Sequence, residues 1–66
     1  MNIAEALPVE QARVRRILAI YQTLGPCGAF GAWSIEQDLQ AADRAAAAGD
    51  VVAMLAAYNT LLDIEA

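Results

Sequence analysis

Two helix-breaking corners divide this chain, and they constrain its fold more than any other feature. Gly25-Pro26 and Gly49-Asp50 each interrupt a long run of helix-forming residues. Glycine can end a helix in the left-handed conformation, proline cannot continue one, and aspartate is a good cap for the next. The 66 residues therefore predict a loose tail over 1–7 and three helices, over about 8–24, 27–48 and 51–64.

Apolar residues recur at three- and four-residue intervals in each predicted helix, and no segment alternates as a strand would. The first stripe is Leu7, Val14, Ile17, Leu18, Tyr21 and Leu24. The second is mostly small: Ala32, Ile35, Leu39, Ala42 and Ala46. The third is Val51 or Val52, Leu55, Tyr58 and Leu62, with Met54 and Leu61 beside it.

These stripes predict an all-α fold of one small domain over 1–66. We expect 27–48 and 51–64 to form an antiparallel αα-hairpin, with 8–24 packed across it. Pro8 is expected in the first turn of the first helix, where its missing N–H costs nothing.

The chain has little material with which to stabilise itself alone. A domain of this size buries only about 60% of the surface its unfolded form exposes. Cys27 is the single cysteine and histidine is absent, so an internal disulfide and a zinc site are both excluded. The 59% hydrophobic composition leaves association as the remedy. We expect a homo-oligomer, most simply a dimer joined through apolar faces of the first two helices.

The charge balance restricts the partner classes. Eight Asp and Glu oppose four Arg and no Lys, for a net charge of −4. Non-specific nucleic-acid binding needs a basic footprint, so direct nucleic-acid binding is not expected, whereas an encounter with a basic partner surface is. No signal peptide and no apolar run of about 20 residues is visible, so no membrane partner is expected and the predicted location is cytoplasmic.

The stretch LGPCGAFGAW places Gly25, Gly28 and Gly31 three apart. A dinucleotide fingerprint would need a preceding strand, and a Walker loop would need a lysine that the chain lacks. The favoured interpretation is a tight corner where another helix approaches closely. The alternative is a nucleotide-like anion held at Gly28 by backbone N–H groups, together with Arg13 and Arg16.

No catalytic constellation is present, and no cofactor or metal is expected. Cys27 lacks a histidine base, so a buried or half-buried packing role is favoured over a reactive thiol. The carboxylates are spread in the way that exposed helix faces spread them. The sequence therefore predicts a protein that is not an enzyme.

A partner-binding surface is the favoured use of the remaining marked residues. Phe30 and Trp33 lie off the main stripe of their helix, and aromatic anchors of this kind mark interface centres. The Arg13, Arg15 and Arg16 cluster could grip a partner, pair with another copy, or simply be solvated, and these possibilities stay open. The predicted partner contacts are Arg13, Arg16, Phe30, Trp33, Glu36 and Gln40.

The segment ILAIYQTLGPCGAFGAWSIEQDLQAADRAAAAGDVVAMLAAY, over 17–58, is similar to short open reading frames in tailed-phage and prophage genomes of proteobacteria. No chemical activity is known for that group, so the resemblance identifies no functional residue. It implies a bacterial cytoplasmic setting and an accessory role. Small acidic phage proteins of this size often bind and block a host protein, and anti-CRISPR proteins are the familiar case.

The leading hypothesis is therefore a non-enzymatic phage-type protein that binds a host protein and blocks it by occupancy. The first alternative is a protein that sequesters a nucleotide-like anion. The second is a virion-assembly or structural subunit.

Overall fold

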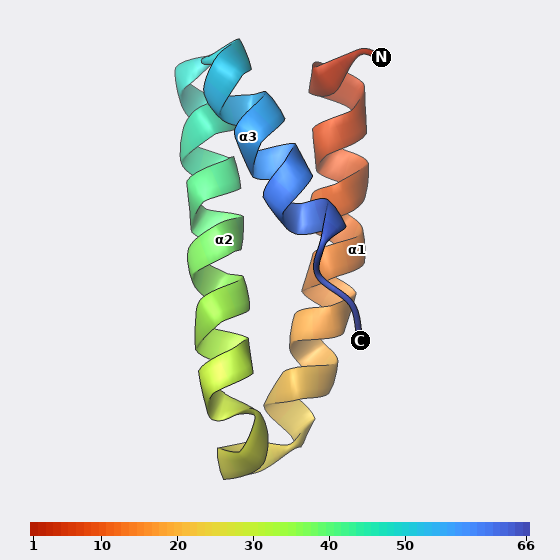
Figure 1. Cartoon of the computed structure of the whole chain (residues 1–66), viewed down its shortest axis with the longest axis vertical. Helices are drawn as coiled ribbons and strands as arrows, with labels where there is room; N and C mark the ends of the chain where they lie inside the picture. Colours follow the sequence, from red (N-terminus) through yellow and green to blue (C-terminus); the bar gives the residue numbers. More distant parts are fainter.

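A computed structural model describes residues 1–66 and confirms the all-α prediction. It contains α1 (Ile3–Thr23), one 3₁₀ turn η1 (Gly25–Gly28), α2 (Ala29–Ala48) and α3 (Val51–Leu62). Figure 1 shows α1 and α2 as a long antiparallel pair, with α3 returning beside them in the direction of α1. The molecule is an elongated bundle of 35 × 17 × 15 Å.

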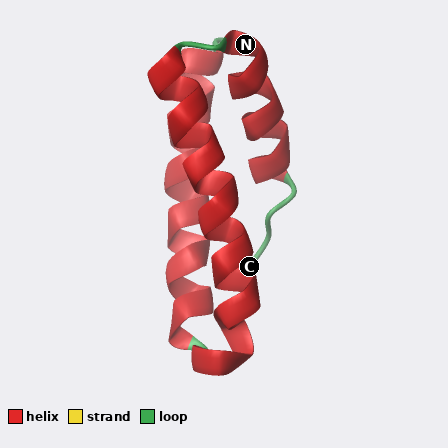
Figure 2. Ribbon diagram, turned by 90° about the vertical axis from the view of Figure 1, so that its left-hand side faces the viewer, coloured by secondary structure: helices red, strands yellow, loops and turns green.

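The short α3 divides the bundle into two unlike ends. α3 has 12 residues against 20 in α2, so it covers only part of the α1–α2 pair, as both Figure 1 and Figure 2 show. We call residues 3–17, 37–48 and α3 the three-helix end. We call residues 18–36, which contain the corner between α1 and α2, the hairpin end.

The predicted tail over 1–7 is wrong, because α1 begins at Ile3. The Asn2 side chain accepts a hydrogen bond from the Ala4 N–H at 3.0 Å and caps the helix. Leu7 has no exposed surface, which anchors this first part of the helix in the core. Pro8 consequently lies inside α1 rather than in its first turn. The Asn2 cap and the burial of Leu7 therefore outweigh the lost Pro8 N–H.

Both corners follow the prediction. Gly25 and Gly49 have φ of 62° and 65°, the left-handed conformation that glycine adopts without a Cβ penalty. The Asp50 carboxylate accepts a hydrogen bond from the Ala53 N–H at 3.1 Å and caps α3. The predicted helix bounds shift slightly: α2 begins at Ala29 because residues 25–28 wind into η1, and α3 ends at Leu62.

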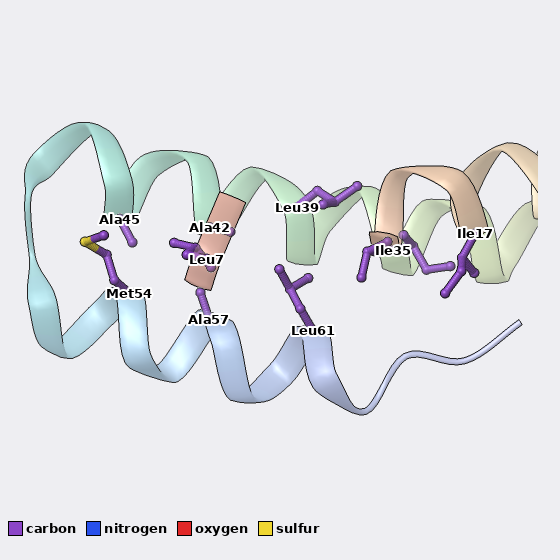
Figure 3. Packing of buried hydrophobic residues seen from close by; sticks show 10 residues of the cluster. Leu7, Ile17, Ile35, Leu39, Ala42, Ala45, Met54, Ala57 and Leu61 are labelled. Atoms are coloured by element: carbon purple, nitrogen blue, oxygen red, sulfur yellow. The ribbon is translucent and has the colours of Figure 1, made fainter. Parts of the chain in front are cut away.

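The core runs along the seam of the three helices, and most of it belongs to the three-helix end (Figure 3). Its members are Leu7, Val14, Ile17, Ile35, Leu39, Ala42, Ala45, Met54, Ala57 and Leu61. Of these, only Ile35 belongs to the hairpin end. The hydrophobic effect that holds the bundle together is therefore concentrated where α3 lies.

Two predicted stripes are displaced in the structure. In α2, Ala45 is buried and Ala46 is exposed. In α3 the buried face is Met54, Ala57 and Leu61, while Val51, Val52, Leu55 and Leu62 are exposed. α3 is apolar on nearly every side, so its periodicity does not single out a face; the space between α1 and α2 selects it.

The predicted arrangement of the helices is confirmed for α2 and α3, which form an antiparallel pair. α1 packs against both of them, antiparallel to α2 and parallel to α3 (Figure 1). The longest pair is α1–α2, and its corner is the glycine stretch.

Candidate interaction surfaces

Phe30 and Trp33 form an exposed aromatic pair near the start of α2. Their ring centroids are 6.1 Å apart with a 35° tilt, within the range of favourable aromatic contacts. Phe30 is 79% exposed and Trp33 57% exposed. The helical period points both away from the buried side of α2, which carries Ala32 and Ile35. The pair contributes little to the core and stands at the hairpin end.

Gln40 and Glu36, the other predicted contacts on α2, point in different directions. Gln40 is exposed, and at seven residues from Trp33 it shares the outward face of the helix. Glu36 is turned towards α1, where its carboxylate accepts a hydrogen bond from the Gln22 amide at 3.4 Å. Phe30, Trp33 and Gln40 therefore belong to one surface, and Glu36 lies on its α1 side.

The Arg13 side chain forms its hydrogen bonds with other residues of the same chain. Its Nε donates to both Glu10 carboxylate oxygens at 3.1 and 3.0 Å. Its two terminal nitrogens donate to the Ile64 carbonyl at 2.9 Å and the Leu61 carbonyl at 2.8 Å. The carbonyls at a helix C-terminus lack intrahelical partners, so this guanidinium caps α3 and ties it to α1.

The environment keeps Arg13 charged. The hydrogen bond to Glu10 raises the pKa of Arg13 above its ordinary value, desolvation opposes that rise, and the charges of Glu10 and Glu65 add to it. Arg13 therefore has an intramolecular clamping role that the sequence did not predict.

The three clustered arginines face three different directions. Arg15 pairs with Asp43 of α2 at 3.1 Å, with about half of each side chain exposed. Asp43 also accepts a hydrogen bond at 2.8 Å from Gln11, the one buried polar residue. Arg16 is exposed and has no hydrogen bond or ion pair within the chain. Arg16 is therefore the only member of the cluster free to meet a partner.

The glycine stretch is a tight corner, as predicted. A Cβ on Gly28 would lie 2.3 Å from the Tyr21 carbonyl oxygen and 2.9 Å from the Leu24 Cβ. A Cβ on Gly31 would lie 2.7 Å from the Tyr21 ring. α1 therefore uses these glycines to approach the start of α2 closely.

The alternative anion site is not assembled in this arrangement. Arg13 is held at the C-terminus of α3, about 16 Å along the α1 axis from Leu24 at about 1.5 Å per residue. Arg16 is roughly 12 Å from Leu24 by the same measure. Gly28 is thus not brought together with either arginine. Cys27 is exposed, so the predicted packing role is wrong; it lies in η1, outside the closely packed side that Gly28 and Gly31 form.

A groove that runs from the hairpin end to Asp38 and the residues after α3 was not predicted, and we call it the hairpin-end groove. It has a volume of about 410 Å³ and opens where α3 has ended. Its apolar lining comes from Tyr21, Phe30, Gly31, Ile35 and Ile64, and its polar lining is Ser34, Asp38, Asp63 and Glu65. The helix lengths could have predicted this groove. A 12-residue α3 that runs antiparallel to a 20-residue α2 must place residues 63–65 beside the middle of α2.

α3 presents a second exposed apolar surface. Val51, Val52, Leu55 and Leu62 are all exposed large hydrophobic residues. The helix VVAMLAAYNTLL contains no charged residue. It is an exposed apolar surface without charge in an acidic chain.

No family model matches the chain, and comparisons with curated proteins and with solved structures return no match. None of the helices is long and apolar enough to cross a bilayer. No three acidic or cysteine side chains are arranged to hold a metal ion. The candidate functional features described above are three surfaces: the aromatic pair, the acidic groove beside it, and the apolar face of α3.

Proposed function

We propose that this chain is a non-enzymatic interaction protein that binds a host protein and blocks it by occupancy, inside a bacterial cell. The observation that carries the proposal is the exposed pair Phe30 and Trp33. Two large aromatic rings in contact on a rigid helix, outside the core, match the anchors that supply most of the energy at protein interfaces. Arg16 and Gln40 are exposed and free to add contacts at the rim.

Blocking by contact requires a rigid scaffold rather than chemistry, and the bundle has that form. The aromatic pair stands on the α2 helix, and the close α1–α2 corner fixes the angle of the first turns. Such preorganisation lowers the ordering cost of association. Neither the anion-sequestering alternative nor the virion-subunit alternative is favoured by a specific observation.

The test is affinity capture with matched variants, followed by an inhibition assay. The immobilised chain is compared with Phe30→Ala/Trp33→Ala and with the control Val9→Ala, which removes an exposed apolar side chain of α1 outside both the aromatic pair and the α3 face. We expect one bacterial protein to be retained by the parent and the control and lost from the aromatic variant. That protein, once purified, should lose its own activity at a stoichiometric ratio of the parent chain.

Two outcomes would contradict the proposal. The first is identical capture by all three chains, because the aromatic pair would then have no role in binding. The second is retention of full activity by the captured protein when it is saturated with the parent chain.

We propose further that two copies associate through α3. A two-fold interface places the same surface of each copy against the other, so it must be self-complementary. The exposed, charge-free face of α3 meets this condition, and charged faces of a chain of net charge −4 would oppose the approach of a copy. Light scattering should give twice the 7.0 kDa chain mass, and Val52→Glu/Leu55→Glu should return it to the single mass. A single mass for the parent chain would refute the dimer.

A further inference from the structure

The carboxylates of the hairpin-end groove differ from the others in the chain. Four of the eight acids accept hydrogen bonds from within the molecule: Glu10, Glu36, Asp43 and Asp50. Of the remaining four, only Glu5 lies elsewhere, in the first turn of α1. Asp38, Asp63 and Glu65 all line the groove. Three of the four carboxylates without a hydrogen bond within the chain thus lie at one groove, where the charge of Glu65 also acts on Arg13.

The apolar part of the same groove suits the stem of a long side chain. Tyr21, Ile35 and Ile64 line it, and the exposed Phe30 ring forms part of its wall. No arginine of the chain lines it. An arginine or lysine from outside could lay its methylene stem on this apolar surface and place its cation near the carboxylates. The aromatic rings would add a cation–π attraction.

We infer that this groove docks a basic segment of the partner protein, with an arginine or lysine side chain seated between Phe30 and the carboxylates of Asp38, Asp63 and Glu65. The inference rests on the proposed function and specifies the chemistry of its partner. A basic protein surface of the kind that binds nucleic acid would be complementary in charge to this groove.

A second copy of this chain fits the groove less well. Two copies would bring together two net charges of −4. Arg13 and Arg15 already have partners within the chain, which leaves Arg16 and Arg44 to offset the repulsion. A basic foreign segment brings attraction without that opposing charge, and long-range attraction also accelerates the encounter.

The test uses a fluorescein-labelled peptide of alternating arginine and leucine, with a glutamate-and-leucine peptide as the control probe. Binding is followed by fluorescence anisotropy at low and at physiological salt. Asp38→Asn/Asp63→Asn should weaken binding of the arginine peptide roughly tenfold. Each surface ion pair contributes only modestly to the binding free energy, and the double variant removes two of them. Glu5→Gln removes a carboxylate outside the groove and should change binding less than about twofold.

Amide chemical shifts locate the site independently. Addition of the arginine peptide should shift the resonances of residues 30–38 and 63–65 and leave residues 3–10 unchanged. Equal weakening by Glu5→Gln, or shifts spread over the whole acidic surface, would overturn the inference in favour of diffuse attraction. A fall from double to single mass in Asp38→Asn/Asp63→Asn would overturn it in favour of a second copy in the groove.

The captured partner separates this inference from the proposed function. If Phe30→Ala/Trp33→Ala loses the partner while Asp38→Asn/Asp63→Asn retains it at full affinity, the groove inference fails and the proposed function stands. If the aromatic variant retains the partner, the proposed function itself fails.

Discussion

The two ends of the bundle bury their apolar side chains to different extents. At the three-helix end, apolar residues from α1, α2 and α3 meet in one seam, and Arg13 donates to the Leu61 and Ile64 carbonyls at the end of α3. At the hairpin end only two helices meet, and Ile20, Leu24, Phe30 and Trp33 remain exposed. One end of the molecule therefore stabilises the fold, and the other leaves apolar surface available for contact. Substitutions at the first end should change stability, and substitutions at the second should change binding.

The largest effect is expected from Leu61→Ala, in the seam of the three-helix end. Leu61 has no exposed surface, whereas its neighbour Leu62 is 45% exposed. Truncating a fully buried leucine lowers the free energy of unfolding by about 3 kcal/mol. In a chain this small, a loss of that size is most of the total stability. Leu62→Ala should cost less than about 1 kcal/mol. Urea unfolding followed by circular dichroism measures both, and equal losses would mean that α3 packs by another face.

The second effect separates two glycines of the same corner, the closely packed Gly28 and the open Gly25. Gly28→Ala would place a Cβ against the backbone carbonyl of Tyr21, and we expect a loss of about 2 kcal/mol because backbone must move. Gly25→Ala meets no atom within 4 Å but keeps a φ of 62°, so the expected loss is about 1 kcal/mol. Thermal unfolding of the two variants gives the comparison. A harmless Gly28→Ala would show that α1 and α2 do not need their close approach.

The third effect concerns the clamp between α1 and α3. Arg13→Gln removes the charge-assisted hydrogen bonds to Glu10, Leu61 and Ile64, and we expect a smaller loss of stability than in Gly28→Ala. Hydrogen exchange should accelerate mainly in the last turn of α3. Because the pKa of Arg13 is raised, its positive charge and hence the clamp's contribution should persist below that pKa and be lost only when the pH rises through it.

The control for the clamp is Arg16→Gln, which removes an exposed arginine without an internal partner. It should change the free energy of unfolding by less than about 0.5 kcal/mol. Arg13→Lys should restore only part of the stability, because an ammonium cannot reproduce the planar fork of a guanidinium. Equal losses for Arg13→Gln and Arg16→Gln would show that the clamp contributes nothing specific.

The same division explains what the sequence could predict. Local signals determine the two corners, so Gly25, Gly49 and Asp50 were predicted correctly, and the three helices followed from them. The face of α3 was missed because its residues are apolar all round, and only the position of α1 and α2 distinguishes Leu61 from Leu62. The start of α1 was missed because Pro8 resembles a first-turn proline, although Leu7 already fell on the apolar stripe of the first helix.

The candidate site divides in the same way. Phe30 and Trp33 could be predicted as exposed because their positions fall off the apolar stripe of one helix. The direction of each arginine could not, because Arg13 meets carbonyls about fifty residues later in the chain. The groove could not be predicted either, because its residues are far apart in the sequence. Asp38 and Glu65 line one groove only because α3 is shorter than α2.

The smallest effect on stability, and the sharpest test of the comparison, is expected from Phe30→Ala. The ring is 79% exposed, so its removal should change the free energy of unfolding by less than about 0.5 kcal/mol. Affinity for a captured partner should nevertheless fall by roughly tenfold to a hundredfold if the ring is an interface anchor. Trp33 is the only tryptophan, so its fluorescence reports on the same surface: emission should be that of a largely hydrated indole in the free chain and shift to shorter wavelength in the complex. A free chain whose indole emission is already that of a buried ring, or a Phe30→Ala variant that unfolds as readily as Leu61→Ala, would mean that the hairpin end is part of the core and that the two ends do not differ in role.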